Sequence, residues 1–150
     1  MGENDMNTDN YFASVGVIVK RENKVLLVRH TYGSAKGKLL NPGGFLKEGE
    51  MPYDAAVREV LEETGVNINP IGFLGIRCEA KCWYMIILAE YISGEPRADE
   101  KENCEALFMD IDEALSHSAV TNTAKKLIAL SLEKEPIIPI DADKGRILFA

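Results

Sequence analysis

The stretch from residue 44 to residue 66, GFLKEGEMPYDAAVREVLEETGV, constrains the fold more than any other part of the chain. Pro52 suits the first turn of a helix, where the amide proton that proline lacks would have no partner within the helix. Gly65 suits the position just past a helix C-terminus, where a left-handed residue is favoured. The sequence therefore predicts a helix that begins at Pro52 and ends at Gly65.

Acidic side chains gather on one side of this predicted helix. With about 100° of rotation per residue, Glu59, Glu62 and Glu63 fall within an arc of about 100°. Like charges at this spacing destabilise a helix by about 0.2–0.5 kcal/mol per pair, and a hard divalent cation with oxygen ligands would offset that repulsion. The opposite side carries residues that can pack against a sheet, namely Tyr53, Ala56, Val57, Val60 and Leu61.

Three glutamates on a helix face are, by themselves, typical of solvated surface. Here they follow the turn Pro42-Gly43-Gly44, whose glycines allow unusual dihedrals or close backbone approach. In chain order the pattern is Gly44, five residues, Glu50, seven residues, Arg58-Glu59-Val60, one residue, Glu62-Glu63, one residue, Gly65-Val66. This order resembles the complete signature box of the Nudix hydrolases, from Gly44 to Val66, with every fixed position filled.

The resemblance covers about residues 12 to 132 and implies an α/β fold, the Nudix-type α/β/α sandwich with a mixed β-sheet. Apolar and β-branched runs predict strands at residues 12–20, 24–30, 66–79, 83–92 and 104–111. We expect a helix capped at Asp112 and a longer one from Thr121 to Glu133. The segment 136–150, interrupted by Pro136 and Pro139, is compatible with a strand or with a partner-binding segment.

Length and charge limit the remaining possibilities. The chain has 150 residues, of which the polar residues 1–10 predict a disordered N-terminal tail and residues 11–150 a single Nudix hydrolase domain. A net charge of −7 argues against non-specific binding to nucleic acid or to anionic membranes. No apolar run approaches the roughly 20 residues of a membrane span, and the N-terminus lacks a signal-peptide pattern. We therefore expect a cytoplasmic protein with no membrane partner and no specific nucleic acid partner, and a homodimer stays open.

The cysteines number three, Cys78, Cys82 and Cys104, an odd count without the spacing of a disulfide framework. Reduced thiols in the cytosol are the simplest interpretation. A zinc site is the minor alternative, because no histidine or fourth cysteine lies nearby.

The resemblance implies hydrolysis of a diphosphate linkage in a nucleoside diphosphate joined to another group X. Such chemistry needs a divalent metal, Mg²⁺ with Mn²⁺ as the alternative, to neutralise phosphoryl oxygens and to activate water. Residue by residue, Glu59, Glu62 and Glu63 become metal ligands, and Gly43 or Gly44 contributes a carbonyl oxygen.

Family members differ in which carboxylate handles the attacking water, so Glu59 and a carboxylate of the later acidic loop stay open. The loop candidates are Glu100, Glu102 and Glu105, and Glu105 is the one included in the predicted catalytic set. Arg58, also in that set, lies beside the carboxylate arc. We expect it to form a buried ion pair, with Glu50 as the candidate partner, that holds the loop against the helix.

Substrate contacts are less clearly marked. Arg29 and Lys38 are candidate phosphate contacts, and Tyr84 stands where dinucleoside polyphosphate hydrolases tend to have a tyrosine. Leu39 and Asn41 replace the Trp and Leu that often precede the Pro-Gly-Gly turn in the family. The aromatic residues then left near the predicted site are Tyr32, Trp83 and Tyr84.

From these features we predict a permissive hydrolase of small-molecule nucleotides. Nucleoside triphosphates or nucleotide sugars are the favoured substrates. The alternatives are a dinucleoside polyphosphate hydrolase and a non-catalytic, nucleotide-sensing Nudix-like binding module.

Overall fold

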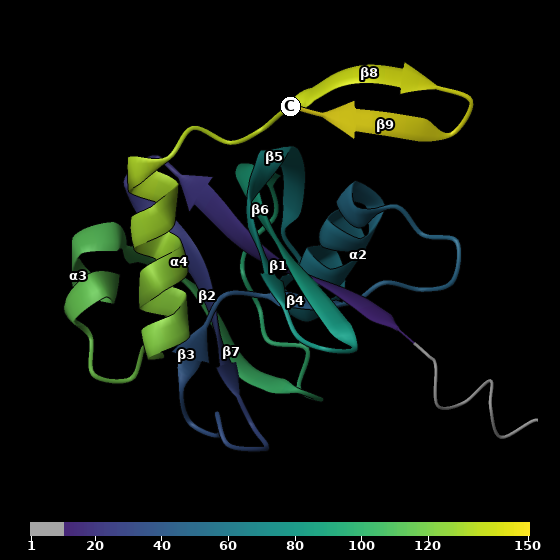
Figure 1. The fold of residues 1–150 in the computed structure, drawn as a ribbon. Coiled ribbons are helices and arrows are strands. Elements are labelled where there is room, and N and C mark those ends of the chain that lie inside the picture. The colour runs from purple at the N-terminus through teal and green to yellow at the C-terminus, as the bar shows by residue number, and fades with distance from the viewer. Residues whose placement is uncertain (1–10) are drawn as a thin grey trace, which may run out of the picture.

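The computed structural model describes residues 11–150, and the predicted N-terminal tail, residues 1–10, lies outside the described residues. A mixed sheet of seven strands lies between two layers of helices (Figure 1). Its strands are β1 (Phe12–Arg21), β2 (Lys24–His30), β3 (Leu39–Leu40), β4 (Gly43–Phe45), β5 (Asn67–Cys78), β6 (Cys82–Ser93) and β7 (Asn103–Asp110). The helices are α2 (Pro52–Thr64), α3 (Ile111–Ser116) and α4 (Asn122–Glu133). The predicted α/β/α sandwich with a mixed sheet is confirmed.

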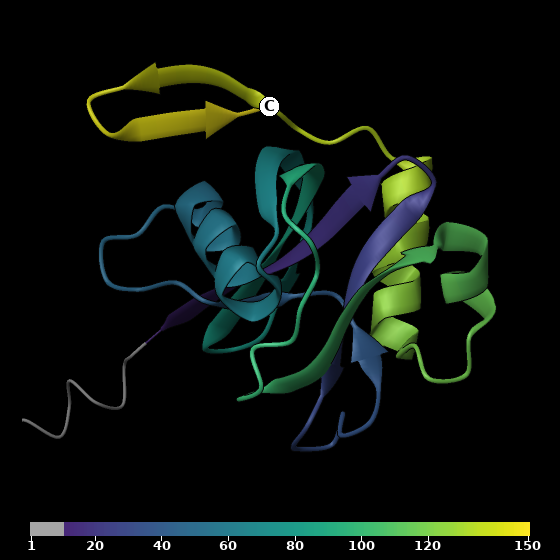
Figure 2. The same ribbon diagram turned by 180° about the vertical axis from the view of Figure 1, so that it is seen from behind.

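Strand β1 is the centre of the sheet. It runs parallel to β6 from Phe12 to Lys20, whereas its pairings with β2 and β4 are antiparallel. Strand β2 pairs antiparallel with β3 and β7, and β5 pairs antiparallel with β6. Because side chains alternate along a strand, Val17 packs in the core under α2 while Ile18 packs in the core under α3 and α4. The two helical layers therefore cover opposite faces of the sheet (Figure 2).

Two details differ from the sequence-based expectations. The helix predicted to be capped at Asp112 begins at Ile111, with Asp110 in the N-cap position, because Ile111 is buried in the core from the first helical turn. Leu61, expected to pack against the sheet, is 45% exposed, whereas Ala55 is fully buried in the core beneath α2. The core face of α2 is thus rotated toward its small residues, and Leu61 faces the segment 94–102.

The C-terminal segment forms a hairpin, β8 (Pro139–Asp143) and β9 (Arg146–Phe149), that projects from the sheet (Figures 1 and 2). Its base is anchored to β5, where Ile137 and Phe73 exchange two backbone hydrogen bonds of 2.9 Å. The ring of Phe149 packs edge-on against Phe73, with 4.5 Å between centroids. All other residues of the two strands are exposed.

The described helices also bear on membrane association. Among residues 11–150, no helix is long and apolar enough to cross a membrane.

Candidate active site

Helix α2 carries the acidic residues, and its ends have the predicted caps. Pro52 occupies the first turn, and Gly65 adopts a left-handed conformation with φ of 74°. The Gly65 amide donates a hydrogen bond of 2.9 Å to the carbonyl oxygen of Leu61, which closes the last turn. The apolar side of α2 packs in the core, and the carboxylates of Glu59 and Glu63 face the glycine turn at 43–44.

Glu63 is a buried carboxylate, with 6% of its surface exposed. The backbone of Gly43 gives it a hydrogen bond, but no Lys, Arg or His among residues 11–150 forms an ion pair with it. Burial, and next the charge of Glu59, raises the pKa of Glu63 to about 8. Glu102 and Asp99 add smaller contributions in the same direction. With a pKa of about 8 this carboxyl is mostly protonated at neutral pH, and a bound cation would favour its charged form.

Arg58 forms the ion pair with Glu50 that the sequence predicts. Its Nε and Nη2 atoms donate to the two carboxylate oxygens of Glu50, each at 2.8 Å. Nη2 also donates to the carbonyl oxygen of Phe45 at 3.1 Å, which ties the loop after β4 to the helix. Nη1 donates to Glu59 at 2.8 Å and to Glu62 at 3.2 Å. The hydrogen bonds that Glu50 accepts from Arg58, and next the one from the Lys47 amide, lower the pKa of Glu50 to about 2.

The glycine turn needs its two glycines because the backbone lies against other groups. A Cβ atom on Gly43 would collide with the carbonyl oxygen of Val15 in β1. A Cβ atom on Gly44 would collide with the carboxylate of Glu59. The turn thus presents bare backbone to the carboxylates of α2.

The acidic loop before β7 has a defined conformation at the site. One carboxylate oxygen of Asp99 accepts hydrogen bonds from three successive amides, those of Lys101, Glu102 and Asn103, at 2.9–3.1 Å. The amide and the hydroxyl of Thr31 both donate to the carbonyl oxygen of Glu102, each at 2.9 Å. Glu102 is consequently held beside the end of β2.

Two cavities meet at the carboxylates. The first, of about 560 Å³, lies between α2 and the segment 94–102, and the second, of about 350 Å³, lies between α2, the glycine turn and the end of β2. Glu59, Glu63 and Glu102 line both cavities. A substrate that spans the two cavities would pass directly over these three side chains.

The donor set fits a hard divalent cation. Carboxylate oxygens are the ligands that Mg²⁺ prefers, and Glu63 is a buried carboxyl that has no ion-pair partner among the described residues. Within the described residues the acidic side chains do not converge into a ready-made cluster of three ligands. The reason is that Glu59 and Glu62 turn toward Arg58, so both would exchange this partner for a bound metal.

Four other predicted site residues do not line the two cavities. Arg29 and Glu105 pair with each other at 3.0 Å across β2 and β7, and neither lines the two cavities. Lys38 is also absent from the residues that line them. The hydroxyl of Tyr84 accepts a hydrogen bond of 3.1 Å from the side-chain amide of Asn41, beneath the glycine turn.

Residues that the sequence interpretation missed line the second cavity. They include His30 and Lys47. The alternation of side chains along β2 could have identified His30. Leu26 faces α2, and His30, four positions later, faces the same side of the sheet. No comparable signal marks Lys47.

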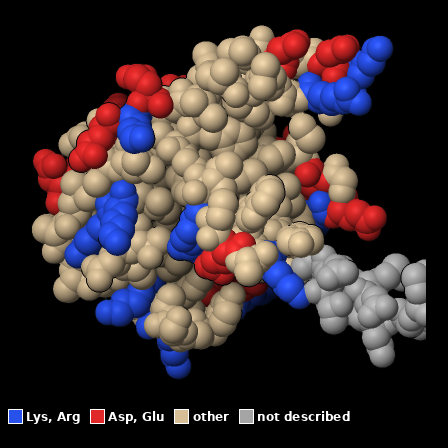
Figure 3. Space-filling view, viewed as in Figure 1, with Lys and Arg blue, Asp and Glu red and all other residues tan. Residues whose placement is uncertain are grey.

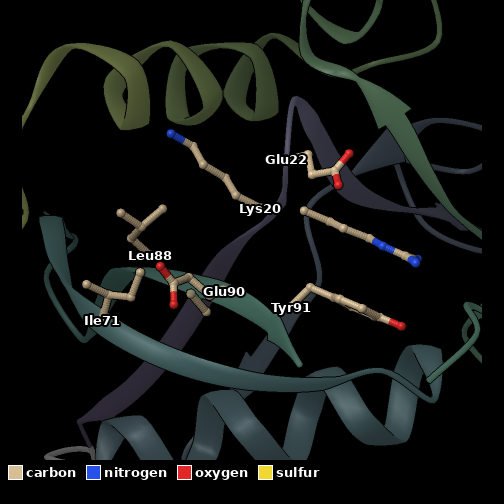
Figure 4. A pocket seen from close by; sticks show the side chains of 8 residues that line it. Lys20, Glu22, Ile71, Leu88, Glu90 and Tyr91 are labelled. Carbon is tan, nitrogen blue, oxygen red and sulfur yellow. The ribbon is translucent and has the colours of Figure 1, made fainter. Parts of the chain in front are cut away.

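A larger cavity, of about 620 Å³, lies away from this site (Figure 4). It is lined by the C-terminal end of β1, including Lys20, whereas the glycine turn pairs with β1 near Val15. The Lys20 side chain extends toward α4 and donates to the carbonyl oxygen of Ser131 at 3.0 Å. The cavity mixes acidic and basic groups and lacks the concentrated negative charge of the carboxylate site.

Known proteins resemble this chain in sequence and in fold. The family model of the NUDIX domain matches residues 10–130. A NAD-capped RNA hydrolase, NudC, of Haemophilus influenzae is 34% identical over 125 residues, which cover 80% of this chain and 47% of that protein. An ADP-ribose pyrophosphatase of Methanocaldococcus jannaschii is 30% identical over 105 residues, which cover 66% of this chain and 62% of that protein. The chain thus spans about half the length of the NudC relatives.

A solved structure shows the same fold. The crystal structure of a Nudix hydrolase from Nitrosomonas europaea superimposes with a TM-score of 0.73 at 23% identity, covering 85% of this chain and 75% of that chain. The family match extends over most of residues 11–150 and includes every residue of the carboxylate site. The chain therefore belongs to the Nudix family.

Proposed function

We propose that the protein is a pyrophosphohydrolase that cleaves a diphosphate linkage in nucleoside diphosphate-X compounds with the help of Mg²⁺ or Mn²⁺. Nucleotide sugars and nucleoside triphosphates are the proposed substrate classes. The names of the relatives specify ADP-ribose and NAD-capped RNA, and both compounds contain a diphosphate. Metal ligation is assigned to Glu59, Glu62 and Glu63, with a backbone carbonyl of Gly43 or Gly44.

The observation that carries this proposal is the buried Glu63 carboxyl, which has no ion-pair partner among the described residues, at the junction of two cavities. Burial disfavours its charged form, and a bound cation would offset that cost. The cavities on either side provide room for the two halves of a substrate whose diphosphate lies at the carboxylates.

Each protein group has a separate task in this proposal. A bound divalent metal would lower the pKa of water and neutralise phosphoryl charge. Glu63 is oriented by burial and by the Gly43 backbone, and the Arg58–Glu50 pair keeps the loop after β4 against α2. Glu102 is the loop carboxylate that we assign to accept the proton of the attacking water, in preference to Glu105, because Glu102 lines both cavities. Glu59 stays the alternative for this step.

The alternative of a dinucleoside polyphosphate hydrolase depended on Tyr84. Its hydroxyl is engaged by Asn41, and its ring lies under the guanidinium of Arg77 at 4.7 Å. Tyr84 therefore gives that alternative no support as a free stacking surface, and nucleotide sugars and triphosphates stay the favoured classes.

A hydrolysis panel tests the proposed function. Purified protein is assayed with ADP-ribose, other nucleotide sugars, nucleoside triphosphates and dinucleoside polyphosphates, with Mg²⁺, with Mn²⁺ and with chelator. We expect turnover only with metal, and a loss of about 100-fold or more in Glu63→Gln, because charge stabilisation at phosphorus is removed. Glu113→Gln, the same change on the exposed surface of α3, serves as the matched control and should keep full activity.

The same panel separates the alternatives. Glu102→Gln and Glu105→Gln, assayed side by side, test which loop carboxylate takes part. Full activity in Glu63→Gln would contradict the metal assignment. Metal-dependent nucleotide binding without any turnover would favour the non-catalytic binding module.

A further inference from the structure

Two aromatic rings are stacked at the wall of the second cavity. His30 is the last residue of β2, and Tyr32 is the second residue of the loop that follows. Their ring centroids lie 5.5 Å apart, with 10° between the ring planes. Both residues line the second cavity, which is also lined by Gly44, Glu59 and Glu63. Tyr32 is nevertheless 54% exposed. With His30 on one side of it, the Tyr32 ring is a flat surface that remains open to a ligand.

This surface is held in place from both sides. Thr31, which lies between His30 and Tyr32 in the sequence, donates through its amide and its hydroxyl to the carbonyl oxygen of Glu102. The far end of the loop returns to β2, where the Gly37 amide donates to the carbonyl oxygen of His30 at 2.9 Å. These bonds hold the loop backbone on either side of Tyr32 relative to the acidic loop, which lowers the ordering cost of binding.

The hydroxyl of Tyr32 lies within electrostatic reach of the carboxylate site. The charge of Glu102, above all, raises the pKa of Tyr32, and Glu63 contributes in the same direction. A planar group stacked on Tyr32 would thus lie beside a diphosphate held at the carboxylates. The cavity volume of about 350 Å³ is within the range of small-ligand sites.

The other two aromatic residues expected near the site are placed differently. Trp83 lines a separate apolar cavity with Tyr11 and Phe12, and that cavity contains none of the carboxylates. Tyr84 is committed to Asn41 through its hydroxyl. Of these three candidate residues, Tyr32 is the one that shares a cavity with Glu59 and Glu63. Phe45 also lines that cavity, but its ring packs edge-on against Phe12 with 6.0 Å between centroids.

We propose that Tyr32, backed by His30, is the specificity-determining surface that stacks the nucleobase of the substrate beside the carboxylate site. Stacking is tolerant of base identity because every base has a π-face, so this surface favours substrates with a base over base-free diphosphates without selecting one base. The assignment rests on the proposed function, since it places the base next to the diphosphate that the carboxylates would act on.

Binding measurements test this assignment independently of turnover. AMP and ribose 5-phosphate have the same sugar phosphate and differ by the base, so calorimetric titration of both, with Mg²⁺ present, isolates the contribution of the ring. We expect Tyr32→Leu to weaken AMP binding by about tenfold and to leave ribose 5-phosphate binding unchanged. Tyr32→Phe keeps the ring and should keep most of the AMP affinity. Trp83→Leu, a change of an exposed aromatic residue in the other cavity, should alter neither.

Kinetics on ADP-ribose adds a second readout. Tyr32→Leu should raise KM by about the same factor with kcat nearly unchanged, because stacking acts equally on bound substrate and transition state. Equal AMP affinity in wild type and Tyr32→Leu, at unchanged melting temperature, would overturn the assignment and leave the proposed function intact. A loss of AMP affinity in Trp83→Leu instead would move the base to the other cavity. Absence of turnover in the wild type would count against the proposed function, whereas the AMP comparison would still decide the role of Tyr32.

Discussion

At the scale of single residues, Arg58 organises the charges around the site. Its guanidinium reaches three carboxylates and a backbone carbonyl at once, and the fork on Glu50 is bidentate. A lysine would keep the positive charge but could not reproduce that planar geometry. The Glu50 pair therefore has a structural task, and the single hydrogen bonds to Glu59 and Glu62 are the ones that the proposed metal would replace.

The pKa of Glu50 predicts a characteristic loss of stability in acid. Hydrogen bonds from Arg58 and from the Lys47 amide lower this pKa to about 2 from its ordinary value of 4.5. The unfolded chain therefore takes up the proton at a higher pH than the folded chain, so the stabilisation is complete above pH 4.5 and is lost as the pH falls toward 2. We expect thermal unfolding to show this slope in the wild type and a shallower slope in Glu50→Gln.

A matched control for this measurement lies two residues away. Glu48 is exposed, and Glu48→Gln should keep the wild-type slope. Identical slopes in wild type and Glu50→Gln would show that the pair with Arg58 does not hold in solution.

Residue-level prediction succeeded for Arg58 and Glu50, whose contact was implied by the resemblance to the family's signature box. It did not single out Glu102, because a loop conformation places this residue. The three amides bound by Asp99 and the bond from the Thr31 hydroxyl, which spans 71 positions of sequence, set that conformation. Neither arrangement has a periodic pattern that a sequence reading could detect.

At the scale of elements, the boundaries that could be predicted are those with local caps. The side-chain oxygen of Thr121 accepts from the Ala124 amide at 3.1 Å and starts α4 one residue past the predicted boundary. The C-terminal hairpin could not be predicted with the same assurance. Its strands are exposed on both faces, so they lack the apolar–polar alternation that identifies a half-buried strand.

The hairpin is predicted to depend on one aromatic anchor. Phe149 contacts Phe73 at 4.5 Å and Tyr53 of α2 at 5.2 Å between centroids, which joins the hairpin to two elements of the core. We expect Phe149→Ala to lower the free energy of unfolding by about 1–3 kcal/mol. Leu148→Ala, next to it but exposed, should change it by less than about 0.5 kcal/mol. Denaturant unfolding of both variants checks this, and equal effects would show that the anchor does not form.

At the scale of the whole molecule, the net charge of −7 gives an anionic substrate no long-range attraction. Figure 3 shows acidic and basic side chains interspersed over one face, with wide uncharged areas between them. Under the proposed function, recognition of a diphosphate would therefore depend on local groups and on bound metal. Composition alone was sufficient to predict the lack of long-range attraction, because that property depends only on the balance of charges.

Metal binding should appear as global stabilisation. A ligand that binds only the folded state at ten times its Kd adds about 1.4 kcal/mol, which corresponds to about 3–6 °C in melting temperature for a chain of this size. We expect Mg²⁺ to raise the melting temperature of the wild type by that amount and to have little effect on Glu63→Gln. Without metal, Glu63→Gln should melt no lower than the wild type, because a neutral amide of the same shape replaces a buried carboxyl whose charged form is disfavoured. Sodium chloride at matched ionic strength is the control, and a full Mg²⁺ shift in Glu63→Gln would exclude this residue as a ligand.

The absence of a side chain at Gly44 has a consequence for how such a site can evolve. A side chain there would need the space that the Glu59 carboxylate occupies, so a change at Gly44 requires that carboxylate to move. The loops at 31–38 and 94–102 supply the other cavity walls and are more open to change, as surface loops generally are. Under the proposed function, substitutions in these loops would therefore alter the substrate while the turn and α2 stay unchanged.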